Sequence, residues 1–140
     1  MKSPGIGMYF KSRWMNAAGI LGFAPEASQR VDYSCLGAFI THPVSLSPRM
    51  PAHGRRYVPF PGGFLLHTGY PNPGLKAIIR RYRDAWQRSP IPVWVHLIGS
   101  EPEELEQMVL SLEDLPGVSG LELGLPPGIN AGLVEPFIRA

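Results

Sequence analysis

The chain has 140 residues and a formal charge of +2, a balance too close to neutral to indicate a nucleic-acid partner. Its 44% hydrophobic content excludes a disordered chain, and no apolar run reaches the ~18 residues of a membrane span. The N-terminal residues lack the apolar segment of a signal peptide, and the single cysteine, Cys35, excludes an intramolecular disulfide and fits a reducing compartment. We therefore expect a single cytoplasmic domain over residues 1–140, with no nucleic-acid partner.

The first third of the chain predicts a strand, an irregular helix and a second strand. A short apolar run at 14–17 leads to Gly19 and Gly22, which mark a tight exit from the first strand. A helix over 25–33 would begin with a proline and an acidic residue, as helices favour, but its apolar spacing is irregular. Residues 36–41 are almost continuously apolar, which is typical of a parallel strand buried on both faces.

A long loop is expected from His42 to about Pro73. Loops of this length inside a compact domain are usually functional or disordered. Its Arg49, Arg55 and Arg56 would either contact a phosphate or acidic substrate, or form a solvated surface. Its apolar side chains favour an ordered, packed loop; they are Tyr57, Phe60, Phe64, Leu65, Leu66 and Tyr70.

Regular elements follow this loop. Apolar residues at i, i+3, i+4, i+7 and i+11 predict a helix from Leu75, and the Pro90–Pro92 segment ends it. Residues 93–98 predict a buried strand. Ser100 and Glu103 have the spacing of a capping box at the start of the next helix.

A fourth strand at 120–123 and a helix from 132 to 140 complete the pattern. Four alternations of strand and helix predict an α/β fold with a parallel sheet. A complete (β/α)8 TIM barrel needs roughly 200 residues or more, so four βα units amount to half of one. Since only 17% of residues are charged, much of the surface is suited to burial. We expect a truncated barrel that lacks its C-terminal half, or a half-barrel completed by a partner, as in a homo-oligomer.

Six segments share their order and spacing with one known family. Residues 16–19 read N-A-A-G where that family has N-A-S-G, and residues 36–41 read L-G-A-F-I-T where it has L-G-A-[IV]-[VI]-T. The other segments are 46–49, 61–74, 92–100 and 121–123. On these segments the chain resembles the N-terminal half of the dihydroorotate dehydrogenases. The resemblance implies an FMN-dependent barrel oxidoreductase of pyrimidine biosynthesis, which oxidises dihydroorotate or a related small cyclic substrate.

The resemblance also implies where the cofactor lies. Residues 17–19 match the stretch beside the flavin, and Thr41 matches as well. His42 takes the place of a lysine that contacts flavin and substrate, and His96 takes the place of a strand asparagine near the flavin. The cofactor-binding residues implied are Ala17, Ala18, Gly19, Thr41, His42 and His96.

The implied substrate site keeps some of the family's residues and lacks its base. The substrate-binding residues implied are His42, Thr68, Gly69, Tyr70 and Asn72. Leu66 replaces an asparagine that contacts the substrate, and residues 124–129 read G-L-P-P-G-I where the family has N-[ILV]-S-C-P-N. A general base needs a side chain that accepts a proton, and this segment offers none. We therefore expect no catalytic residue in this chain and impaired oxidation of dihydroorotate.

Two other functions stay open. One is a non-catalytic half-barrel that acts as an assembly or binding module. The other is a metal-dependent barrel enzyme that uses His42, His67 and His96, which would lie near the carboxyl ends of the strands. Three histidines without an obvious carboxylate do not by themselves indicate zinc, so we expect no metal site.

Overall fold

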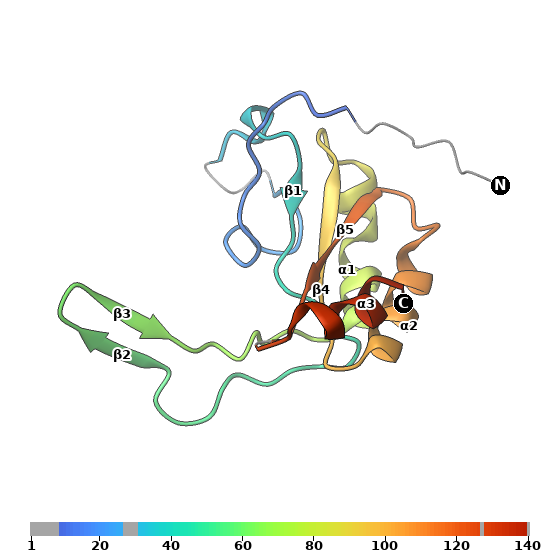
Figure 1. The fold of residues 1–140 in the computed structure, drawn as a ribbon. Coiled ribbons are helices and arrows are strands. Elements are labelled where there is room, and N and C mark those ends of the chain that lie inside the picture. The colour runs from blue at the N-terminus through green and yellow to red at the C-terminus, as the bar shows by residue number, and fades with distance from the viewer. Residues whose placement is uncertain (1–8, 27–30, 127, 140) are drawn as a thin grey trace.

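The computed structural model describes residues 9–26, 31–126 and 128–139. A small parallel sheet carries helices on one side, and a two-stranded hairpin projects far from it (Figure 1). The elements in chain order are η1 (Tyr33–Cys35), β1 (Phe39–Ile40), β2 (Tyr57–Phe60), β3 (Gly63–Leu66), α1 (Leu75–Gln87), β4 (Val93–Ile98), α2 (Pro102–Leu112), β5 (Val118–Gly124) and α3 (Ala131–Arg139).

The sheet has the order β1-β4-β5, and both strand pairs are parallel. Ile40 pairs with Trp94, and His96 pairs with Glu122. Next to β1, Met15 forms a single parallel bridge with Ala38. The Met15 segment, β1, β4 and β5 therefore lie side by side in the order in which they follow along the chain, as neighbouring strands of a barrel do. The predicted α/β fold with a parallel sheet is confirmed.

The predicted first strand at 14–17 is wrong, because only the bridge at Met15 is formed. The side chain of Asn16 explains where the pairing stops. Its Nδ2 donates to the carbonyl of Ile40 at 2.7 Å, and its Oδ1 accepts from the amide of Ile40 at 2.9 Å. Both backbone groups that a longer ladder would use are therefore taken by a side chain.

The predicted helix at 25–33 is also wrong where the structure describes it. Residues 25–26 and 31–32 are not helical, and 27–30 lie outside the described residues. The irregular apolar spacing gives a helix no face to bury, and a short 3-10 turn forms at η1 instead. Hydrogen bonds from the hydroxyl and then the amide of Ser34 hold the pKa of Asp32 below its ordinary value.

The long loop contains the antiparallel hairpin of β2 and β3. Pro61 and Gly62 occupy its turn, and Gly62 adopts φ +92°, a conformation that glycine takes without steric cost. The expectation that this loop packs its apolar residues is wrong. The side chains of Tyr57, Phe60, Phe64, Leu65, Leu66 and Tyr70 are all at least half exposed.

The helix from Leu75 and the strand at 93–98 are confirmed. Along β4, alternate residues are buried in the core with α1 and α2, and the other three face the opposite, inner side of the sheet. The buried residues are Val93, Val95 and Leu97, and those on the inner face are Trp94, His96 and Ile98.

The predicted capping box of Ser100 and Glu103 is wrong by one residue. Helix α2 begins at Pro102, a residue that needs no amide partner in the first turn, and the carboxylate of Glu104 accepts from the amide of Ser100 at 2.9 Å. Among the described residues, no helix combines the length and apolar character needed to cross a bilayer.

Candidate functional site

A cavity of about 530 Å³ lies at the carboxyl end of the sheet. The hairpin of β2 and β3 departs from this end (Figure 1). Three segments that are distant in sequence form its walls: the loop after Asn16, the two residues after Thr41, and the return leg of the hairpin. Its lining residues are Ala18, Gly19, Phe23, His42, Pro43, Leu66, His67, Thr68, Gly69, Tyr70 and Pro71. In α/β barrels this end of the sheet carries the active site.

The return leg of the hairpin is held by backbone pairing with the outgoing leg. Arg49 and Asn72 exchange two backbone hydrogen bonds, at 2.8 and 3.1 Å, and the amide of Ala52 donates to the carbonyl of Thr68 at 2.9 Å. Gly69 adopts φ +76°, and a Cβ there would lie 2.6 Å from the backbone nitrogen of Ala52. Only glycine fits this close approach, so the cavity wall between Thr68 and Pro71 depends on it.

Asn72 anchors the base of this leg. Its side chain is buried, and its Oδ1 accepts from the amides of Gly74 at 3.0 Å and Ser45 at 3.3 Å. Its Nδ2 donates to the hydroxyl of Ser45 and to the carbonyl of Tyr70, both at 3.0 Å. The amide is thus fully engaged within the chain, and substrate binding by Asn72 stays a prediction.

Among the residues that the structure describes, the cavity lining carries no Asp, Glu, Lys or Arg. The ring of His42 lies 5.2 Å from that of Phe23, and burial lowers the pKa of His42 below its ordinary value of 6.5. His42 is therefore neutral at pH 7, and the walls otherwise present mainly small, aromatic and hydroxyl groups. These walls suit a planar, uncharged ring better than a phosphate.

The structure brings most of the expected site residues to this cavity. Six of them line it: Ala18, Gly19, His42, Thr68, Gly69 and Tyr70. The other four do not: Ala17, Thr41, Asn72 and His96. Thr41 is fully buried, and its Oγ1 accepts from the amide of His96 at 3.0 Å and donates to the carbonyl of His42 at 2.9 Å. It therefore positions the backbone next to the site.

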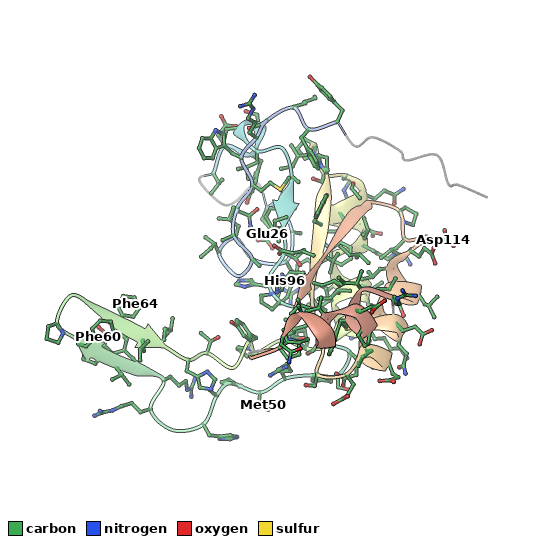
Figure 2. The ribbon with its side chains drawn as sticks, viewed as in Figure 1. Glu26, Met50, Phe60, Phe64, His96 and Asp114 are labelled. Carbon is green, nitrogen blue, oxygen red and sulfur yellow. The ribbon has the colours of Figure 1, made fainter. Side chains whose placement is uncertain are left out.

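His96 has a carboxylate partner that the sequence alone does not reveal. Its Nδ1 lies 2.6 Å from Oε2 of Glu122, and both side chains are on the inner face of the sheet. Figure 2 labels His96 near the carboxyl end of β4. His96 is the fourth residue of β4 and Glu122 the fifth of β5, and a register shift between Val93 and Trp94 places them opposite each other, so counting along the two strands does not indicate the pair.

The three histidines are not gathered in one metal site. His42 and His67 line the cavity, whereas His96 contacts Glu122. Within the described residues, no group of three His, Cys, Asp or Glu side chains could hold a metal ion. The metal-dependent alternative thus gains no support.

Comparison with known proteins decides the ancestry. The sequence model of the family described as dihydroorotate dehydrogenase matches residues 2–127. This chain belongs to the dihydroorotate dehydrogenase family. It is 34% identical over 127 residues to the "Dihydroorotate dehydrogenase B (NAD(+)), catalytic subunit" of Pelobacter propionicus, covering 90% of this chain and 42% of that protein.

Other members of the same subunit family give similar values. Identity is 33% over 119 residues with the protein of Trichlorobacter lovleyi, for 84% of this chain and 39% of the relative. Identity is 29% over 127 residues with the protein of Geobacillus kaustophilus, and the match covers 90% of this chain and 41% of that relative. This dihydroorotate dehydrogenase homologue therefore spans about two-fifths of the length of the curated relatives it matches.

Proposed function

We propose that the chain forms one wall of the flavin site of an FMN-dependent oxidoreductase that acts on dihydroorotate or a related small cyclic substrate in pyrimidine biosynthesis. The observation that carries this proposal is the uncharged cavity at the carboxyl end of the sheet, formed by segments that resemble those beside flavin and substrate in the family. Bound FMN would supply a two-electron acceptor for the oxidation.

The lining residues fit the ring portion of FMN. Ala18 and Gly19 leave room for a flat ligand, and neutral His42 presents ring nitrogens without a net charge. Thr68 and Tyr70 would lie toward the substrate. A phosphate is usually held by Lys or Arg side chains, and the described lining has none, so it would be held outside the cavity.

Turnover by this chain alone is expected to be impaired. The segment after β5 has no side chain that accepts a proton at the position of the family's Cys or Ser base. We propose that a C-terminal half or a second subunit completes the barrel. The single cysteine, Cys35, supports a reducing, cytoplasmic location for the protein.

The proposal is tested by titrating the purified chain with lumiflavin and with FMN, following flavin fluorescence. Both should bind with similar affinity, because the lining provides no phosphate contact. Ala18→Phe, which fills the cavity, should abolish binding, whereas the exposed Ser119→Ala should leave it unchanged. If neither flavin binds the parent chain, flavin chemistry is excluded for this wall and the non-catalytic assembly module is favoured.

A further inference from the structure

The hairpin of β2 and β3 presents apolar side chains on both of its faces. Because residues opposite each other in an antiparallel pair share a face, the register separates the side chains into two sets. One face carries Tyr57, Pro59, Phe64 and Leu66, and the other carries Val58, Phe60, Gly63 and Leu65. An antiparallel sheet with one side in water usually alternates apolar and polar residues. No residue from 57 to 66 is charged or carries a side-chain amide, so neither face is of the kind that usually meets water.

The side-chain contacts agree with this register, and they leave the hairpin outside the core. The rings of Tyr57 and Phe64 lie 5.3 Å apart, and a Cβ at Gly63 would lie 3.1 Å from the Phe60 ring. The large side chains are between 50% exposed, at Phe60, and 66% exposed, at Leu65. Figure 2 shows Phe60 and Phe64 on the projecting hairpin, away from the sheet. A contiguous exposed apolar surface of this kind usually marks a contact with another protein or with a membrane.

The sequence around the hairpin is positively charged and contains no acidic residue. From residue 33 to residue 83 there is no Asp or Glu, and there are seven basic residues: Arg49, Arg55, Arg56, Lys76, Arg80, Arg81 and Arg83. Arg55 and Arg56 directly precede β2, and the carbonyl of Arg56 accepts from the amide of His67 at 2.8 Å, which extends the hairpin pairing to its base. Both arginines are exposed, and neither forms an ion pair with a described residue. Two cations therefore lie at the base of an apolar projection.

Apolar groups beyond a pair of cations match the two layers of an anionic membrane surface. Aromatic and aliphatic side chains enter the boundary between headgroups and acyl chains, about 5–10 Å deep, while arginines stay at the phosphates. A strand of four residues is about 13 Å long, which reaches this boundary but not across the ~30 Å hydrocarbon core. Lipid surrounds an inserted hairpin on every side, whereas a protein groove covers one face. The two apolar faces therefore favour a membrane over a protein partner.

We propose that the hairpin docks the chain onto an anionic lipid membrane, with residues 57–66 at the acyl boundary and Arg55 and Arg56 on the headgroup phosphates. The chain is then held at the membrane surface without spanning it, and shallow insertion leaves the backbone groups at the hairpin edges within reach of water. This inference goes beyond the proposed function and does not depend on it, because only Leu66 among residues 57–66 lines the cavity.

The first test is sedimentation of the purified chain with vesicles of phosphatidylcholine that contain about one-third phosphatidylserine. The parent chain should bind, and Leu65→Ser should weaken binding roughly tenfold, because the apolar side chain no longer enters the lipid. Leu110→Ser on α2 is the matched control, since Leu110 is also 66% exposed, and it should leave binding unchanged. Equal binding of the parent and Leu65→Ser overturns the proposal.

The second test concerns the charges at the base of the hairpin. Replacing both Arg55 and Arg56 by Gln should weaken binding to the anionic vesicles about 25-fold, at about fivefold for each arginine near the surface. The double variant Arg80→Gln, Arg83→Gln removes two exposed cations of α1 and should have a much smaller effect. Circular dichroism checks that all variants fold. Equal affinity of the parent for vesicles of phosphatidylcholine alone overturns the role of the arginines and the proposal with it.

The third test measures insertion directly, by fluorescence with lipids that carry bromine on their acyl chains. Phe64→Trp should add emission that these lipids quench. Ile138→Trp on α3, at a position that is 69% exposed, should add emission that they do not quench. Equal quenching of the two added tryptophans overturns the proposal.

Two further outcomes would assign the hairpin to a protein partner instead. If the chain forms a dimer without lipid, Leu65→Ser dissociates this dimer and vesicles do not bind, the hairpin is a contact between copies and the proposal is overturned. If polyglutamate binds the parent as tightly as the anionic vesicles do, and Leu65→Ser changes neither affinity, the partner is an acidic protein and the proposal is likewise overturned.

Discussion

Asn16 holds both backbone groups of Ile40 with a single side-chain amide, at 2.7 and 2.9 Å. The contact joins residues 24 positions apart and fastens the loop that carries Ala18 and Gly19 to strand β1. Because Ile40 is buried, its amide and carbonyl have little access to water if the contact is lost.

Asn16→Ala should therefore lower the free energy of unfolding by about 1–3 kcal/mol, the cost of leaving buried backbone groups without partners. Urea denaturation followed by circular dichroism measures this change. Gln87→Ala, at the exposed end of α1, is the control and should alter stability by less than about 0.5 kcal/mol. Equal stabilities of the two variants would contradict the role given to Asn16.

The close packing of Trp94 on Gly120 gives a second prediction. Gly120→Ala places a methyl group 2.7 Å from the ring, so Trp94 or β5 must shift, at a cost of about 1–3 kcal/mol. Ser119→Ala, on the neighbouring exposed position, controls for the change in strand propensity. Thermal melts of the two variants should differ, and a Gly120→Ala protein as stable as Ser119→Ala would show that the inner face is loosely packed.

Asn72 gives a third prediction, because it binds four groups at the base of the hairpin. Asn72→Ala should cost about 1–3 kcal/mol and should expose the amides of Ser45 and Gly74 to hydrogen exchange. Asn72→Asp keeps the acceptor and loses the donor, so it should protect these two amides better than alanine does. Unchanged exchange in Asn72→Ala would mean that the backbone pairing with Arg49 alone holds the leg.

His42 makes stability depend on pH. Burial lowers its pKa in the folded chain below 6.5, so the unfolded chain binds a proton more readily. The stability associated with the neutral ring is fully present above pH 6.5 and is lost as the pH falls through the folded value. His42→Asn should therefore flatten the fall in unfolding free energy between pH 8 and 5, measured in urea, while exposed His53→Asn should not. Parallel curves for His42→Asn and the parent would contradict this.

Much of the fold can be predicted from the sequence where a pattern is local. The 3.6-residue spacing from Leu75 marks α1, and the apolar run at 93–98 marks β4. The end of the strand predicted at 14–17 cannot be found in the same way, because the side chain of Asn16 takes the place of backbone pairing with Ile40. The hairpin was not foreseen, since Pro59 within β2 reads as a loop residue yet is accepted in a strand that has only one partner.

Only part of the candidate site can be predicted from the sequence, for a related reason. The segments that line the cavity follow from resemblance, but the pair of His96 and Glu122 depends on the register between two strands 26 residues apart. Strand register is set when the strands pair in the folded sheet, so the sequence alone does not specify which residues of β4 and β5 lie opposite each other.

The absence of Asp, Glu, Lys and Arg from the described cavity walls has a consequence for how a ligand would be selected there. Salt weakens only interactions between charges, so the affinity of such a lining for a neutral ring should be the same at low and at high salt concentration. If a complete enzyme loses its cofactor more readily as the salt concentration rises, that loss would reflect the surface that binds the phosphate. At the cavity wall described here, ligands would be selected by their shape.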